Sequence, residues 1–227
     1  MSKENERVVW IDIAKAISIF LIVLGHTLRE GIVHQTVYSF HVVAFFLLSG
    51  MTCRTDNVAK RIKNDFLRIM IPYYIFGFAS IAIFMFLGKF AATQLEMYVD
   101  TSVGYNIWGL LYANPALNPM KFNMPLWFLP SLFIVKICYY TLSKVCRQKP
   151  SILFSCCCGL SILAVVYSSF DFPALPFNLS VSFKMLPFFS IGRIIFSNIS
   201  LRKSKGGGYS ESLMHFSSEH RCSFWLL

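Results

Sequence analysis

The chain has 227 residues, of which 56% are hydrophobic and 14% are charged, and its formal net charge is +10. A soluble domain needs about a quarter of its residues charged to cover its surface, so this composition excludes an ordinary soluble protein. The Lys and Arg residues fall mainly between apolar segments, which favours membrane topology over nucleic-acid binding as the reason for the positive charge.

Six apolar segments approach the length that a helix needs to cross a bilayer, about 20 residues. The predicted spans are Val8 to Leu28, Val37 to Cys53, Ile69 to Leu87, Met124 to Leu142, Ile152 to Phe170, and Val181 to Ile199. The second is short for a bilayer. The sequence therefore predicts an all-α protein, a multi-pass bundle of about six transmembrane helices.

The distribution of basic residues predicts the orientation of this bundle. With a cytoplasmic N-terminus, fourteen of the twenty-one Lys and Arg residues lie on the inner side. Three inner connections carry most of them: Arg54, Lys60, Arg61, Lys63 and Arg68; Lys144, Arg147 and Lys149; Arg202, Lys203 and Lys205. Arg29, Lys89, Lys121 and Lys184 remain outside.

Two segments do not fit the pattern of spans. The stretch from Tyr105 to Tyr112 is too short to span, and we interpret it as a re-entrant or interfacial segment at the outer side. Residues 201–227 contain three consecutive glycines and many serines, so residues 1–200 are predicted to form the membrane domain and the rest a cytoplasmic, disordered tail. No metal role is assigned to the tail residues His215, His220 and Cys222, and the other cysteines are interpreted as packing residues.

The first predicted span carries three ionisable residues, Asp12, Lys15 and His26. Lys15 and His26 are eleven positions apart, about three helical turns, and Asp12 lies about 60° from Lys15 around the helix, so all three share one face. Eleven residues also separate the lysine from the histidine by about 16 Å along the axis. This face predicts a polar stripe from the inner side to the outer side.

A simpler interpretation remains open for each of these residues. Asp12 and Lys15 can pair with each other at the inner interface, and His26 can lie among the outer headgroups. His41, early in the second span, favours the functional interpretation, because antiparallel packing would bring it close to His26. His34 lies in the predicted outer loop and is expected to be solvated.

A neutral histidine is suited to general-base work, because its ordinary pKa lies near physiological pH and burial lowers it further. Lys15, Arg61 and Arg68 are the cations available at the inner side for a phosphate-bearing ligand. Arg61 and Arg68 can equally be inner-loop charges that only set the topology.

Four segments occur in an order that resembles the acyltransferase 3 family of integral-membrane O-acyltransferases. They are Trp10 to Ala16 continuing to Val23 to His26, Ser39 to His41 continuing to Phe45 to Gly50, Arg68 with Ile71 to Tyr73, and Pro125 to Pro130. Within that family, these segments most resemble the subgroup of fucose 4-O-acetyltransferase-like proteins. Asn64 and Asp65 depart from the family pattern, because they stand where basic residues are common.

The resemblance implies transfer of an acetyl group from acetyl-CoA, as co-substrate and with no bound cofactor, to a hydroxyl of a cell-surface polysaccharide, lipopolysaccharide or lipid-linked sugar. It implies a protein of the bacterial cytoplasmic membrane. The placement of the basic residues between apolar segments gives no reason to expect a nucleic-acid partner. His26 matches the family's essential histidine and Lys15 its basic residue, often an arginine. The expected catalytic residues are His26 and His41, and the expected donor- or substrate-binding residues are Lys15, Asp12, Arg68, Arg61 and Trp127.

Family members usually have about ten spans, so the resemblance also implies a chain truncated at its C-terminal end. Two alternatives to acyl transfer therefore stay open. A transporter would also need a polar stripe through the bundle, although the six spans show no evident internal repeat. The second alternative is an inactive or regulatory fragment of the acyltransferase.

Overall fold

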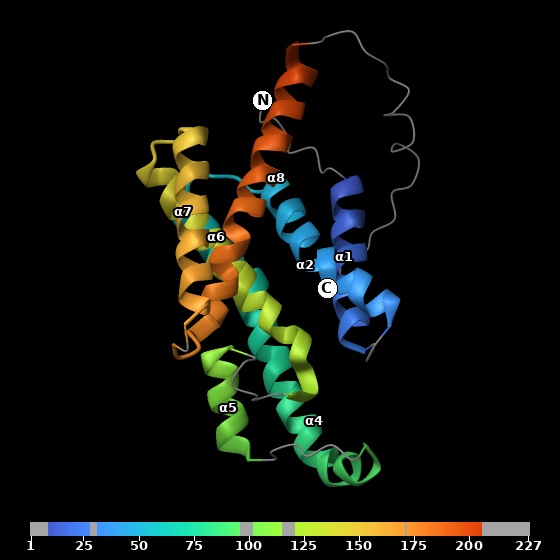
Figure 1. Cartoon of the computed structure of the whole chain (residues 1–227). Coiled ribbons are helices and arrows are strands. Elements are labelled where there is room, and N and C mark those ends of the chain that lie inside the picture. The colour runs from blue at the N-terminus through green and yellow to red at the C-terminus, as the bar shows by residue number, and fades with distance from the viewer. Residues whose placement is uncertain (1–8, 28–30, 96–101, 115–120, 171, 206–227) are drawn as a thin grey trace.

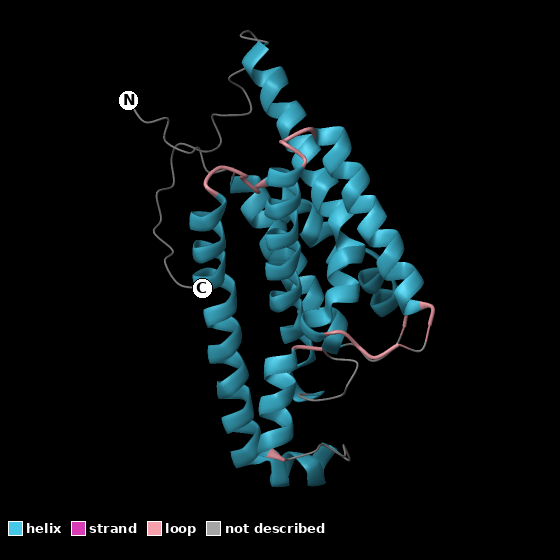
Figure 2. Ribbon diagram, turned by 90° about the vertical axis from the view of Figure 1, so that its left-hand side faces the viewer, coloured by secondary structure: helices cyan, strands magenta, loops and turns pink. Residues whose placement is uncertain are grey.

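The computed structural model describes residues 9–27, 31–95, 102–114, 121–170 and 172–205, and all regular elements in these ranges are helices (Figure 2). In chain order they are α1 (Val9–Thr27), α2 (Ile32–Met51), α3 (Val58–Asp65), the π-helical turn η1 (Phe66–Met70), α4 (Ile71–Leu95), α5 (Val103–Tyr112), the 3₁₀ segment η3 (Lys121–Trp127), α6 (Phe128–Val145), α7 (Pro150–Ser168), η4 (Pro176–Asn178) and α8 (Leu179–Lys205). The predicted all-α fold is confirmed.

Four helical segments of the described residues are long and apolar enough to cross a membrane: Val58–Leu87, Pro125–Val145, Pro150–Ser168 and Pro176–Ile199. They correspond to the last four predicted spans. The first two predicted spans correspond to α1 and α2, which have 19 and 20 residues, with the apolar part of α2 running from Phe40 to Met51. The chain is therefore a helical membrane bundle.

The helix ends sort into two groups at opposite ends of the bundle (Figure 1). The start of α1, the α2–α3 connection, the α6–α7 connection and the end of α8 lie in the upper part of the view. These segments carry most of the basic residues, so the positive-inside rule assigns this end to the cytoplasm. We call it the inner end and the opposite end, which carries α5, the outer end.

Two sequence-based assignments need correction. The third span begins at Val58 rather than Ile69, because the charged segment predicted as loop forms α3 and continues through η1 into α4. Asn57 stabilises its start, since its side chain accepts a hydrogen bond from the Lys60 backbone N–H at 3.3 Å. His34 belongs to the first turns of α2 rather than to a loop.

Glycines allow α2 and α8 to pack with their backbones in close contact. A Cβ atom on Gly50 would lie 1.9 Å from the carbonyl oxygen of Phe189, and one on Gly192 would lie 1.9 Å from that of Leu47. The contact is reciprocal, with a glycine of each helix facing a carbonyl of the other. Small residues serve helix packing in membranes in this way, because lipid provides no hydrophobic force between helices.

A second, smaller core holds α5 against α4 at the outer end. The Tyr73 hydroxyl donates a hydrogen bond to the Leu110 carbonyl oxygen at 2.6 Å, and both residues are buried. Gly77 makes room for the same leucine side chain. The short aromatic segment of the sequence is therefore a helix of 10 residues anchored to a long one.

Candidate active site

Helix α1 runs without interruption from Val9 to Thr27 and therefore carries both Lys15 and His26. Its buried positions, Ile11, Ser18, Ile22 and Gly25, form one stripe along the helix. The half-buried Lys15 lies on this stripe, and position 26 follows Ile22 by one helical turn. The backbone of position 26 is described, whereas its side chain lies outside the described part of the structure.

A hydrogen bond between α1 and the end of α2 sets the register of the hairpin. Lys15 Nζ donates to Thr52 Oγ1 at 2.5 Å. When two antiparallel helices pack side by side, a pair of residues that face each other fixes the register. Counting the same number of residues forward on one helix and backward on the other then reaches two positions at the same level. Eleven residues after Lys15 is position 26, and eleven residues before Thr52 is His41, whose side chain is 1% exposed. Positions 26 and 41 therefore lie at one level of the hairpin, to within about a turn.

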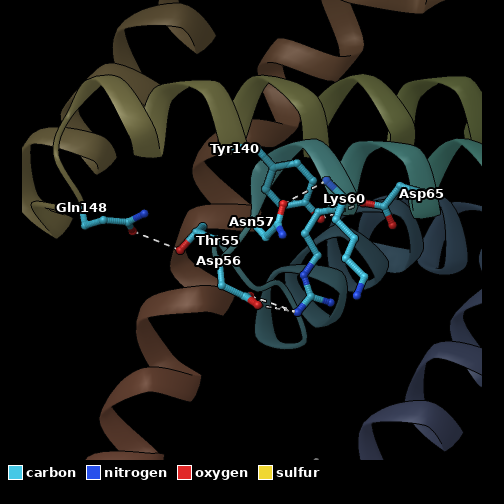
Figure 3. A network of polar contacts seen from close by, with 8 residues as sticks. Thr55, Asp56, Asn57, Lys60, Asp65, Tyr140 and Gln148 are labelled. Atoms are coloured by element: carbon cyan, nitrogen blue, oxygen red, sulfur yellow. Dashed lines mark hydrogen bonds and ion pairs between the residues drawn. The ribbon is translucent and has the colours of Figure 1, made fainter.

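Charged side chains from three helices meet toward the inner end. Lys136 Nζ of α6 forms a salt bridge with Asp65 Oδ1 of α3 at 2.6 Å. The Tyr140 hydroxyl donates to the second oxygen of the same carboxylate at 2.7 Å (Figure 3). Lys15 lies close enough to Lys136 for their positive charges to repel, and Asp12 offsets part of that charge. We call Asp12, Lys15, Asp65, Lys136 and Tyr140 the inner charged layer.

The remaining predicted site residues lie apart from this layer. Arg61 donates to both carboxylate oxygens of Asp56, at 2.9 and 3.0 Å (Figure 3). This hydrogen bonding lowers the pKa of Asp56 below its ordinary value. Arg68 is exposed on η1. Trp127, at the end of η3, packs edge-on against Phe128 with ring centroids 6.3 Å apart, and η3 contacts α1.

Sequence reasoning did not identify Asp65, Lys136 or Tyr140 as site residues. Asp65 was named only as a departure from the family pattern, and Lys136 and Tyr140 were not singled out. A lone lysine within a predicted membrane helix does carry a signal, because its insertion cost requires a partner of opposite charge. The identity of that partner depends on the tertiary fold, because the partner is Asp65 and 71 residues separate Asp65 from Lys136 in the sequence.

Cysteine and metal chemistry have little support in the described residues. All six described cysteines are free thiols, and no three His, Cys, Asp or Glu side chains in the described ranges are arranged as a metal site. The tail residues His215, His220 and Cys222 lie outside those ranges. The ionisable groups described in this site are therefore cations, the carboxylates of Asp12 and Asp65, and the buried His41.

Comparison with known sequences assigns the chain to a protein family. Neither the curated proteins nor the solved structures include a match to this chain. The family model described as an acyltransferase domain, that of the acyltransferase 3 family, matches residues 8–213. This match includes the α1–α2 hairpin, the inner charged layer and all of α8. The chain therefore belongs to the acyltransferase 3 family.

Proposed function

We propose that this protein is a membrane-bound O-acyltransferase of the cytoplasmic membrane, which moves an acetyl group from acetyl-CoA to a hydroxyl of a cell-surface carbohydrate. The family supports acyl transfer in general. The register of the α1–α2 hairpin is the observation that supports the site. It brings positions 26 and 41 to one level, with Lys15 about 16 Å closer to the inner end.

In this proposal, His26 is the general base. Its neutral imidazole accepts the proton of the sugar hydroxyl while the hydroxyl oxygen attacks the thioester carbonyl carbon. The carbon–sulfur bond then breaks, and the imidazolium returns the proton to the departing thiolate. His41 orients the acceptor or the imidazole, a role that suits its complete burial at the same level of the hairpin.

Lys15 is the proposed binding group for the donor. Asp65 already bonds Lys136 and Tyr140, so it does not neutralise Lys15. Asp12 offsets part of the positive charge of Lys15, and the hydrogen bond to the neutral Thr52 hydroxyl leaves the ammonium able to bind an anionic ligand.

The other proposed binding residues differ in what must change before they can contact a ligand. Arg68 is exposed near the inner interface and is available to a phosphate without rearrangement. Arg61 must first release Asp56. Trp127 lies toward the outer end, where its segment contacts α1, and is proposed to contact the acceptor side of the reaction.

The deciding experiment replaces His26 by alanine and measures acetylation of surface glycans by mass spectrometry in cells that express the protein. His34→Ala is the matched control, because it removes another histidine from the same hairpin. We expect acetylation to disappear with His26→Ala and to persist with His34→Ala, at equal amounts of protein in the membrane. Unchanged acetylation in His26→Ala would refute the assignment, and glycan transport without any acyl donor would favour a transporter.

A further inference from the structure

A cavity of about 180 Å³ lies at the inner end of the bundle. Residues of α6, α7 and α8 line it, together with the α2–α3 and α6–α7 connections. Thr55 and Gln148 close it where the two connections meet, because the Thr55 hydroxyl donates to Gln148 Oε1 at 3.0 Å (Figure 3). None of the residues assigned to acyl transfer above lines this cavity.

Arg193 gives the cavity its charge. It is the only charged side chain among the described residues of the lining, and the other polar groups are hydroxyls and amides. No carboxylate in the described part of the chain forms a salt bridge with it. A guanidinium within a membrane helix that has no acidic partner favours an anionic ligand, since its insertion is costly.

Ser190 and Gln148 add hydrogen-bond donors to that charge. The Ser190 hydroxyl is buried close to Tyr139 and Cys157, but neither contact has hydrogen-bond geometry, so it is unpartnered among the described residues. Gln148 Oε1 accepts from Thr55 and from Ser143, at 3.0 and 2.9 Å. Its side-chain NH₂ group, whose two hydrogens are both donors, is therefore left for a ligand.

We propose that this cavity binds a phosphate group of the acyl-CoA donor, with Arg193 as the charge and Ser190 and Gln148 as neutral donors. A whole drug-sized ligand needs about 300 to 1,000 Å³, so this space suits one end of a longer molecule. Gly50 contacts Phe189 and Gly192 contacts Leu47 on two helices that both run toward the inner end. Arg193 is therefore about level with Met51, ten residues or about 15 Å toward the inner end from His41. The inference rests on the proposed function for the identity of the donor.

The test measures binding of non-acetylated CoA and of 3′,5′-ADP, its phosphate-bearing end, by calorimetry. The full chain is placed in nanodiscs of zwitterionic phosphatidylcholine. Arg193→Gln is expected to weaken binding of both ligands at least about tenfold, the loss typical of one charged hydrogen bond. Lys144→Gln, which removes an exposed charge near the same end but outside the cavity, should bind as the wild type does.

Ser190→Ala keeps the test decisive if Arg193→Gln fails to fold. Removing an unpartnered buried hydroxyl should leave the thermal unfolding midpoint of the ligand-free protein unchanged or raised, while CoA binding weakens several-fold. Ser131→Ala is the matched control, because its hydroxyl is also buried and unpartnered among the described residues but does not line the cavity. It should leave binding unchanged.

Three outcomes would overturn the proposal. The first is equal CoA affinity in the wild type, Arg193→Gln and Ser190→Ala. The second is weaker binding in Ser131→Ala as well as in Ser190→Ala. The third is that phosphatidylglycerol nanodiscs stabilise the wild type but not Arg193→Gln, while the wild type does not bind CoA. That result would assign the cavity to a lipid headgroup. His26→Ala should still bind CoA, so loss of binding and loss of catalysis are separate failures.

Discussion

Lys136 and Asp65 form a 2.6 Å salt bridge that joins α6 to α3 across 71 residues of sequence. Both side chains are mostly buried, with 19% and 13% of their surface exposed, and Tyr140 completes the hydrogen bonding of the carboxylate. A satisfied pair of this kind adds little net stability over apolar residues, whereas loss of one partner leaves a buried charge. The contact therefore fixes where α3 meets α6.

Asp65→Asn should destabilise the fold by about 3 kcal/mol, because it leaves the Lys136 ammonium buried without its counter-charge. Asp56→Asn is the comparison, since its partner Arg61 lies in an exposed pair, with 31% and 67% of the two side chains exposed. That change should cost under about 1 kcal/mol. Unfolding of the two variants in detergent measures both values, and equal losses would contradict a special role for the buried pair.

Lys15→Met should lower acetyl transfer by at least about tenfold, since it removes a half-buried cation and its bond to Thr52. Lys15→Arg keeps the charge and should retain more activity than Lys15→Met. Acetylation rates at saturating and limiting acetyl-CoA distinguish a binding role from a structural one. The binding role predicts a raised KM for acetyl-CoA in Lys15→Met, and a change in protein amount alone would contradict it.

Gly50→Ala should prevent α2 and α8 from packing, because the new Cβ would lie 1.9 Å from the carbonyl oxygen of Phe189. Gly159→Ala is the matched control, as a Cβ there meets no atom within 4 Å. Alanine at an open helical position should be neutral or stabilise by up to about 1 kcal/mol. The yield and unfolding midpoint of purified protein report both, and a well-folded Gly50→Ala would show that the helices separate at little cost.

Tyr73→Phe should loosen α5 by about 1 kcal/mol, because the buried Leu110 carbonyl loses the tyrosine hydroxyl that binds it. Tyr74 lies beside it, with ring centroids 5.1 Å apart, and Tyr74→Phe provides the control. Hydrogen exchange of the α5 amides measures the local change. Faster exchange is expected only in Tyr73→Phe, and equal exchange in both variants would contradict an anchoring role for the bond.

The sequence predicts features that depend on the periodicity of one helix. It does not predict side-chain contacts between two helices. The stripe of Asp12, Lys15 and His26 follows from helical periodicity alone. The level of His41 required the hairpin register, which the Lys15–Thr52 bond provides. The Lys136–Asp65 pair and the Arg193 cavity depend on tertiary packing, so periodicity along a single helix could not identify them.

The helix boundaries also were predicted well where they depend on local hydrophobicity and less well elsewhere. The apolar spans were predicted close to their observed positions, because hydrophobic length depends only on local sequence. Residues 58–65 were expected to form a loop because they are charged, yet they extend the membrane helix beyond the apolar core. Polar composition signals the end of the hydrocarbon region, and a helix can continue past that point when its start is capped.

The paired glycine contacts of α2 and α8 have a mechanical consequence. A carbonyl of each helix is seated over a glycine of the other, at Gly50 and Gly192, so neither helix can slide along its partner without lifting away. His41 and Arg193 are thereby carried on one stiff unit with a constant offset. Movement of an acyl donor or acceptor through this region must therefore come from reorientation of that ligand and of nearby side chains. It cannot come from sliding of α2 against α8.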